Sequence, residues 1–211
     1  MKNTALLSIA FIATFTANIA SAQSNFGKFE LTAYGGYRFG GTFEDVDNGI
    51  TIDLDDDSSF GLIFNIRESA NTQWEIIYSR QTTRADTSEL DIPEQSLDLD
   101  IHYFQGGGTY QGSSDRVRPY LAVTIGGTFI EPGLSEFDSD VFWSFSFGTG
   151  LNFMPTKRLG VRLEARVFAT LVDSDSSLFC GSGPAGAFCA ISVDGKMLWQ
   201  LETFAGVVFR F

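Results

Sequence analysis

Eight separate segments of this chain alternate apolar and polar residues with a period of two, and this pattern constrains the fold more than any other feature. A period of two places successive side chains on opposite faces of a β-strand. The expected strands are Phe29–Gly40, Ser59–Ile66, Thr72–Gln81, Ser96–Gln111, Arg118–Ile130, Val141–Met154, Gly160–Val172 and Met197–Phe211. The sequence therefore predicts an all-β protein of eight antiparallel strands.

The two faces of these segments differ in a way that indicates which face meets lipid. The polar faces carry interspersed opposite charges and many glycines, as a narrow packed interior requires. Aromatic residues gather near segment ends on the apolar faces, where the interfacial girdles of a membrane barrel lie: Phe29, Phe39, Trp143, Phe153, Trp199 and Phe211. A soluble sandwich or barrel with its apolar face inward is the alternative. Both observations favour an up-and-down transmembrane barrel with its apolar face outward.

The fourth and fifth segments fit this pattern less well. Gln105, Gly107 and Thr109 fall on the lipid-facing side if the alternation continues through them. A β-bulge in this region is one way to restore the alternation.

The N-terminus has the pattern of a secretory signal. Lys2 is followed by the apolar run Ala5–Phe15 and by the small-residue motif Ala20-Ser21-Ala22. We therefore expect a signal peptide over residues 1–22 and a barrel domain over 23–211, with a signal anchor as the alternative. Beyond residue 22 no apolar stretch approaches the roughly 18 residues of a membrane helix. An exported chain of this kind crosses a membrane only as a closed barrel.

The connections between the segments alternate in length. The short ones are Arg67–Asn71, Gly112–Val117 and Pro155–Leu159, and the long ones are Gly41–Ser58, Thr82–Gln95, Glu131–Asp140 and Asp173–Lys196. The long connections contain 18 acidic residues and two basic ones. Short inner turns and long outer loops predict a bacterial outer-membrane barrel with both termini in the periplasm and with acidic extracellular loops.

Composition excludes several classes of function. A net charge of −12 argues against nucleic acid as a partner, because that binding depends on neutralising phosphates. One His and two Cys are too few for a multi-ligand His/Cys metal site, and no cofactor is predicted. The run Asp53, Asp55, Asp56 and Asp57 is a weak candidate for divalent cations, since it lacks the ligand spacing of an EF-hand.

The chain resembles the small outer-membrane barrels of the OmpA/OmpX/OmpW-like superfamily. The resemblance rests on Ala205–Phe211, on Tyr103–Tyr110 followed by Arg118-Pro119-Tyr120, and on Leu159–Arg166. It implies that Val207, Phe209 and Phe211 form a C-terminal signal read by the barrel insertion machinery. It further implies a monomer in contact with outer-membrane lipid and lipopolysaccharide. An OmpA-type periplasmic peptidoglycan-binding domain is not expected, because the chain stops at its last strand.

Two groups of residues are candidates for a structural role. Cys180 and Cys189 lie in the longest outer loop, and an even cysteine count in an exported protein favours a disulfide over two free thiols. Charged residues expected to face the lumen are Glu30, Arg38, Glu75, Asp98, Asp100, His102, Arg162, Glu164, Arg166, Glu202 and Arg210. A salt-bridged plug is the expected role of these charges, and a proton or small-ion path is the alternative.

Three functions from different classes follow. The leading hypothesis is a non-enzymatic barrel whose acidic, disulfide-pinned loops form a binding surface or help to maintain the envelope. The second is a narrow, porin-like pore or an OmpW-like conduit for small molecules. The third is a lipid A-modifying enzyme that uses His102, the single histidine, although no nucleophilic serine can be placed beside it.

Overall fold

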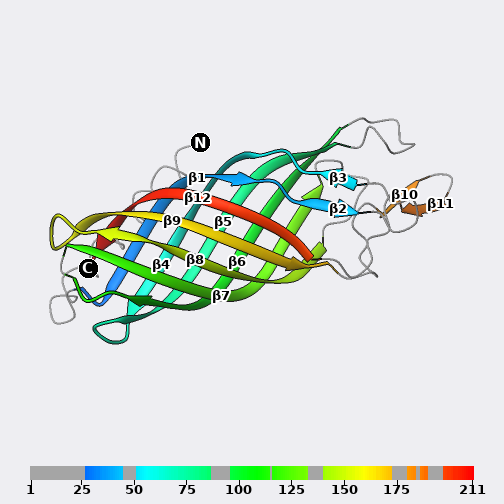
Figure 1. Cartoon of the computed structure of the whole chain (residues 1–211). Coiled ribbons are helices and arrows are strands. Elements are labelled where there is room, and N and C mark those ends of the chain that lie inside the picture. Colours follow the sequence, from blue (N-terminus) through cyan, green and yellow to red (C-terminus); the bar gives the residue numbers. More distant parts are fainter. Residues whose placement is uncertain are drawn as a thin grey trace, which may run out of the picture.

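Eight long strands close into one barrel in the computed structural model, which describes residues 27–44, 51–86, 96–114, 116–132, 140–172, 180–183, 186–189 and 197–211. The predicted signal peptide, residues 1–22, lies outside the described residues. The barrel strands are β1 (Phe29–Phe39), β4 (Asp57–Arg67), β5 (Thr72–Asp86), β6 (Ser96–Gln111), β7 (Val117–Pro132), β8 (Asp140–Phe153), β9 (Leu159–Leu171) and β12 (Met197–Arg210). The predicted all-β, eight-stranded antiparallel barrel is confirmed (Figure 1).

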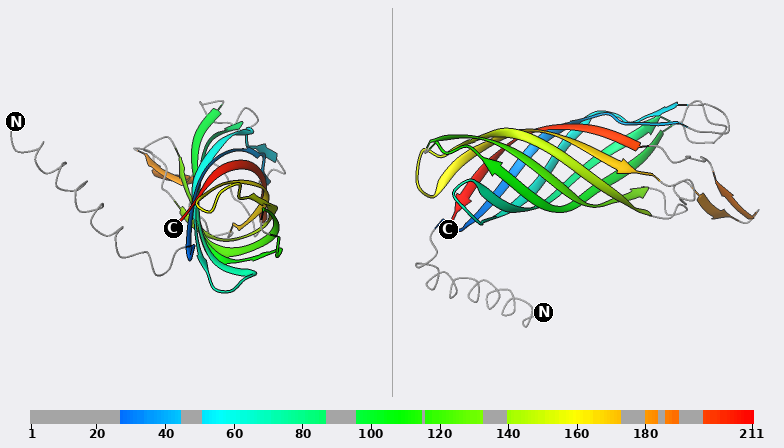
Figure 2. Two further views of the ribbon diagram at one scale, coloured as in Figure 1. Left: turned by 90° about the vertical axis from the view of Figure 1, so that its left-hand side faces the viewer. Right: turned by 60° about the horizontal axis from the view of Figure 1, so that its bottom comes forward.

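Each strand of the barrel pairs with its neighbours in the sequence, and β1 closes the barrel by pairing with both β12 and β4. The two ends of the described chain meet at this seam, where Phe29 and Phe211 exchange backbone hydrogen bonds of 3.1 and 2.9 Å. The end-on view in Figure 2 shows the closed ring of strands. Closure leaves the eight barrel strands without an open edge, as a structure that crosses lipid requires.

The two ends of the barrel differ. The turn end carries the three short connections between β4 and β5, β6 and β7, and β8 and β9, together with Phe211 (Figure 1). The loop end carries two small hairpins, β2 (Thr42–Glu44) with β3 (Thr51–Asp53), and β10 (Cys180–Gly183) with β11 (Gly186–Cys189). Neither hairpin was expected from the sequence, which placed both regions in long loops.

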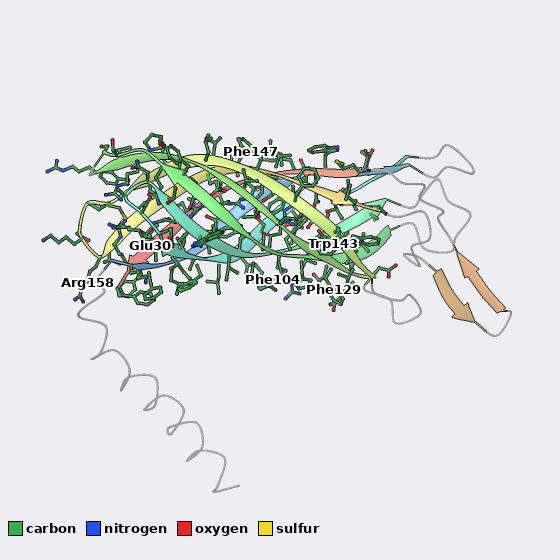
Figure 3. The ribbon with its side chains drawn as sticks, turned by 90° about the horizontal axis from the view of Figure 1, so that it is seen from below. Glu30, Phe104, Phe129, Trp143, Phe147 and Arg158 are labelled. Atoms are coloured by element: carbon green, nitrogen blue, oxygen red, sulfur yellow. The ribbon has the colours of Figure 1, made fainter. Side chains whose placement is uncertain are left out.

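Large apolar side chains cover the outside of the barrel. The exposed ones include Phe104, Trp143 and Phe147, which point away from the barrel axis in Figure 3. Aromatic residues mark both ends of this surface: Trp74, Tyr110 and Phe153 at the turn end, and Phe39, Trp143 and Trp199 at the loop end. An apolar band between aromatic girdles is typical of a barrel that faces lipid. Among the described residues no helix has the length and hydrophobicity needed to cross a membrane.

No β-bulge interrupts β6 or β7, so the possibility of a bulge that the sequence left open is not realised. The pairing of β5 with β6 and of β6 with β7 runs from end to end without a skipped residue. Gln105 and Thr109 point into the barrel and are almost fully buried, while Phe104 and Tyr110 point outward. The alternation in β6 therefore had the opposite phase to the predicted one.

Candidate functional site

Four charged side chains form a closed network in the interior, toward the turn end. Arg162, Glu164 and Arg166 occupy alternate positions of β9, so all three project inward, and Glu75 of β5 faces them across the lumen. Arg162 and Arg166 both donate to Glu75, at 2.8 and 2.6 Å, and both also donate to Glu164. Two positive and two negative charges thus neutralise one another where water is excluded.

Neutral groups complete this network. Tyr120 donates to Glu164 at 2.6 Å, and Asn65 donates to Glu75 at 3.0 Å. Gly148 and Gly150 of β8 leave the space that the network occupies, because a Cβ atom at either position would collide with Glu164 or with the Tyr120 hydroxyl. Burial of charge is tolerated only with this kind of pairing. Tyr120 and Asn65 were not predicted from the sequence, since nothing in β4 or β7 marks them as partners of a charge.

Two further charge groups lie in the interior and are separate from this network. At the turn end, Glu30 accepts hydrogen bonds from Arg67, Gln73 and Arg210 at 2.9–3.1 Å. Near the middle, Arg38 donates to Glu202 at 3.1 Å and to Ser79. The seven inward charges of β1, β9 and β12, all predicted to face the lumen, are therefore divided among three groups. Arg67 belongs to the group around Glu30, although it was expected to lie in the turn Arg67–Asn71.

Arg38 marks the boundary between two kinds of interior. Its guanidinium carbon lies 4.8 Å from the ring centre of Tyr103 and 5.0 Å from that of Phe168. Its Nε and Nη1 atoms have no hydrogen-bond partner among the described residues. Stacking of the guanidinium plane against aromatic rings partly replaces those hydrogen bonds.

Beyond Arg38 the interior is mostly apolar toward the loop end. The buried apolar side chains there come from five barrel strands and from the segments that follow β3 and β9: Leu54, Ala85, Leu99, Ile101, Ile130, Phe142, Val172 and Leu198. Each of them is at most 6% exposed. Leu54 is held over this end by its backbone, which pairs with Ala85 and donates to Gly41. The sequence analysis predicted the charged residues of the interior but not this apolar part.

Asp98, Asp100 and His102 do not face the lumen, and this corrects the prediction. They lie on the outer face of β6, while Leu99, Ile101 and Tyr103 point inward. Asp98 pairs with Arg84 and Asp100 with Arg80, both from β5, at 3.0 and 2.8 Å. His102 shares a hydrogen bond of 2.9 Å between Nδ1 and the Tyr78 hydroxyl. The error arose because polar residues were assumed to face inward along the whole length of the strand.

The remaining predicted residues lie at the two ends. Val207, Phe209 and Phe211 are on the outer face at the turn end. Asp53, Asp55, Asp56 and Asp57 are all exposed near β3 and β4 and, among the described residues, do not bring three ligand atoms together for one ion. The backbone register of β10 and β11 places Cys180 directly opposite Cys189.

Comparison with known proteins gives the same architecture. Residues 7–178 match the model of the outer membrane protein beta-barrel domain family. Among solved structures, Neisserial surface protein A is 13% identical with a TM-score of 0.57, and the alignment covers 87% of this chain and 97% of that protein. OprG from Pseudomonas aeruginosa is 12% identical with a TM-score of 0.54, over 88% of this chain and 97% of OprG. No curated protein sequence matches.

Proposed function

Since this chain belongs to the outer membrane protein beta-barrel domain family, we propose that it is a non-conducting, non-enzymatic barrel that binds partners through its acidic loops. In this proposal the loop end is extracellular, and both termini lie in the periplasm. The barrel is an inert anchor, and the binding surface is the acidic loop end.

One observation carries the non-conducting part of the proposal: the interior is filled with side chains. Side chains that line a water-filled pore remain accessible to water. Here the inward charges Arg38, Glu75, Arg166 and Glu202 are at most 1% exposed, and the apolar residues beyond them are also buried. An eight-stranded barrel has an interior just wide enough for side chains to fill. The charges therefore serve better as a plug than as an ion path.

The orientation is supported by the distribution of connections and charge. Gly27 and Phe211 lie at the same end as the three short turns. The acidic residues Asp53, Asp55, Asp56 and Asp57 are exposed at the opposite end. Barrels of this class have short periplasmic turns and longer extracellular loops. We therefore place the loop end outside, in contact with lipopolysaccharide and with cationic partners.

The proposed disulfide is supported by the register of the loop hairpin. Cys180 and Cys189 are cross-strand partners in β10 and β11, and opposed residues of an antiparallel pair have closely spaced Cβ atoms. A bond there would fix the hairpin that projects from the loop end. Val207, Phe209 and Phe211 present an aromatic-ended, outward-facing stripe at the turn end, and we assign to it the role of the signal for the insertion machinery.

Single-channel recording tests the non-conducting part of the proposal. We expect the barrel, folded with its cysteines oxidised and checked by heat-modifiable gel mobility, to give no discrete conductance steps in planar bilayers. The paired variant Arg166→Ala/Phe168→Ala removes two large inward side chains and serves as the control for detection. Reproducible steps from the wild-type barrel would favour the pore instead.

A cationic probe tests the binding part. Vesicle-embedded barrel is titrated with fluorescent polylysine at low ionic strength, where surface charge is least screened. Neutralising three exposed loop-end carboxylates in Asp55→Asn/Asp56→Asn/Asp57→Asn is expected to weaken binding. The control Glu68→Gln neutralises one carboxylate at the turn end. When the loop end faces the probe, this control is expected to leave polylysine binding unchanged. Equal effects of both variants would contradict a loop-end site.

A further inference from the structure

Three potential metal ligands converge on the outer face of the barrel, near the loop end. They are Asp100 and His102 of β6 and Glu131 of β7, and their ligand atoms all lie within 4.8 Å of one another. We propose that these three residues bind a divalent transition-metal ion such as Zn²⁺. This site is independent of the acidic loop surface and of the charges inside the barrel.

The register of β6 and β7 produces this convergence. Asp100 is paired with Glu131, and His102 is two residues further along the same strand, so all three side chains share one face. Like charges directly opposite each other on a sheet destabilise it. The Glu131 carboxylate has no hydrogen bond or ion pair with any residue that the structure describes. Arg80 offsets part of the Asp100 charge, and a bound cation would relieve the repulsion that remains between the two carboxylates.

Neighbouring side chains orient two of the three ligands. The Tyr78 hydroxyl shares a hydrogen bond of 2.9 Å with Nδ1 of His102, and in the tautomer in which Nδ1 donates this bond the lone pair of Nε2 is available to a metal. Asp100 accepts from Arg80 at 2.8 Å on one oxygen and from Thr82 at 2.5 Å on the other. A carboxylate has about four lone-pair positions, so these two donors leave Asp100 able to coordinate. Metal-ligating His and carboxylate groups are usually held by second hydrogen bonds of this kind.

The donor set favours a transition metal over Ca²⁺ or Mg²⁺. It combines one imidazole nitrogen with two carboxylate oxygens, whereas Ca²⁺ and Mg²⁺ prefer oxygen ligands alone. Three protein ligands leave a fourth position of a tetrahedral Zn²⁺ site for water or another ligand. Asp100 and His102 are half-buried and Glu131 is exposed, so an ion can reach the site without any opening of the barrel.

Titration of the folded, untagged barrel with ZnCl₂ in excess MgCl₂ tests the proposal. Excess Mg²⁺ occupies general acidic sites, and the absence of a histidine tag leaves His102 as the single imidazole of the chain. We expect one Zn²⁺ per barrel and a shift of the single imidazole NMR signal at the same stoichiometry. An imidazole signal that does not respond to Zn²⁺ would overturn the proposal without the need for any variant.

Four surface variants, each checked for folding by gel mobility, locate the ion. His102→Ala and Glu131→Gln are expected to weaken Zn²⁺ binding by more than about tenfold, and Tyr78→Phe by about tenfold, because it removes only the group that orients His102. The matched control is Asp98→Asn, which removes a carboxylate from the same face of β6 outside the site. Unchanged affinity in His102→Ala, or equal losses in His102→Ala and Asp98→Asn, would refute the site.

Discussion

The two halves of the barrel interior hold the same strands together by opposite means. In the charged half, Glu75, Arg162, Glu164 and Arg166 neutralise one another through short hydrogen bonds. In the apolar half, beyond Arg38, most inward side chains are aliphatic or aromatic, and the buried threonines among them, Thr83, Thr128 and Thr170, are hydrogen-bonded. The outer surface of β6 changes in the reverse sense, from Phe104 beside the charged part to His102, Asp100 and Asp98 at the loop end. Figure 3 shows the two ends, with Glu30 and Arg158 at one and Trp143 and Phe129 at the other.

This reversal teaches that the medium outside the strand decides what faces inward. Where lipid covers the outer surface, apolar residues are most stable outside, and polar residues must find partners within the lumen. Where β5 and β6 extend past the aromatic girdle, water covers the outer surface, and the usual order of a soluble barrel returns. One strand can therefore carry both arrangements without a bulge or a change of register.

The largest effect is expected from breaking the charged half at Glu75. Glu75→Ala leaves Arg162 and Arg166 with one carboxylate between them in a site without water. Removing one partner of a buried charge pair costs about 3–5 kcal/mol of unfolding free energy. Reversible urea unfolding of the barrel in phospholipid vesicles measures it. The control Asp98→Ala, which breaks an exposed pair, is expected to cost about 0–1 kcal/mol. Similar losses in both variants would show that the network contributes no more than a surface ion pair.

A smaller loss is expected when the network keeps its charges and loses one neutral group. Tyr120→Phe removes the hydroxyl that donates to Glu164 at 2.6 Å and accepts from Arg162 at 2.8 Å. Hydrogen bonds to charged groups contribute about 1.5–3 kcal/mol, so we expect a loss of that size in the same unfolding assay. A variant as stable as the wild type would mean that the ion pairs alone satisfy the network.

The sequence predicted the architecture well because the alternation of side chains follows directly from strand geometry. All eight barrel strands were placed within a few residues, except that β5 continues to Asp86, five residues past its predicted end. The extension was missed because its outward residues are polar, as in a loop. The inverted phase of β6 has the same cause. Inward pairs such as Glu75 with Arg162 depend on which strands face one another across the lumen. The alternation of residues along each strand does not predict which strands these are.

The apolar half is expected to be sensitive to a single added hydroxyl. Val172 is buried in the same apolar cluster as Leu198 and Phe142. Val172→Thr keeps the size of the side chain and places a polar group in this apolar cluster. An unsatisfied buried hydroxyl costs about 1–3 kcal/mol. Guanidinium unfolding of the variant against the wild type measures this cost, and a loss below the experimental error would mean that the loop-end interior admits water.

The reverse substitution in the charged half is expected to have the smallest effect and the opposite sign. Thr32 lies on β1, inside the barrel at 1% exposure, and its hydroxyl has no hydrogen-bond partner among the described residues. Thr32→Val removes a buried polar atom that gains nothing from folding, so we expect unfolding free energy to rise by up to about 1 kcal/mol. Measured beside Val172→Thr, it separates two explanations of the comparison. If the charged half were uniformly polar and hydrated, Thr32→Val would destabilise the barrel. If polarity in the charged half is confined to paired groups such as Glu75 and Arg162, Thr32→Val would not destabilise the barrel. The two halves would then differ only at the positions of the charged pairs.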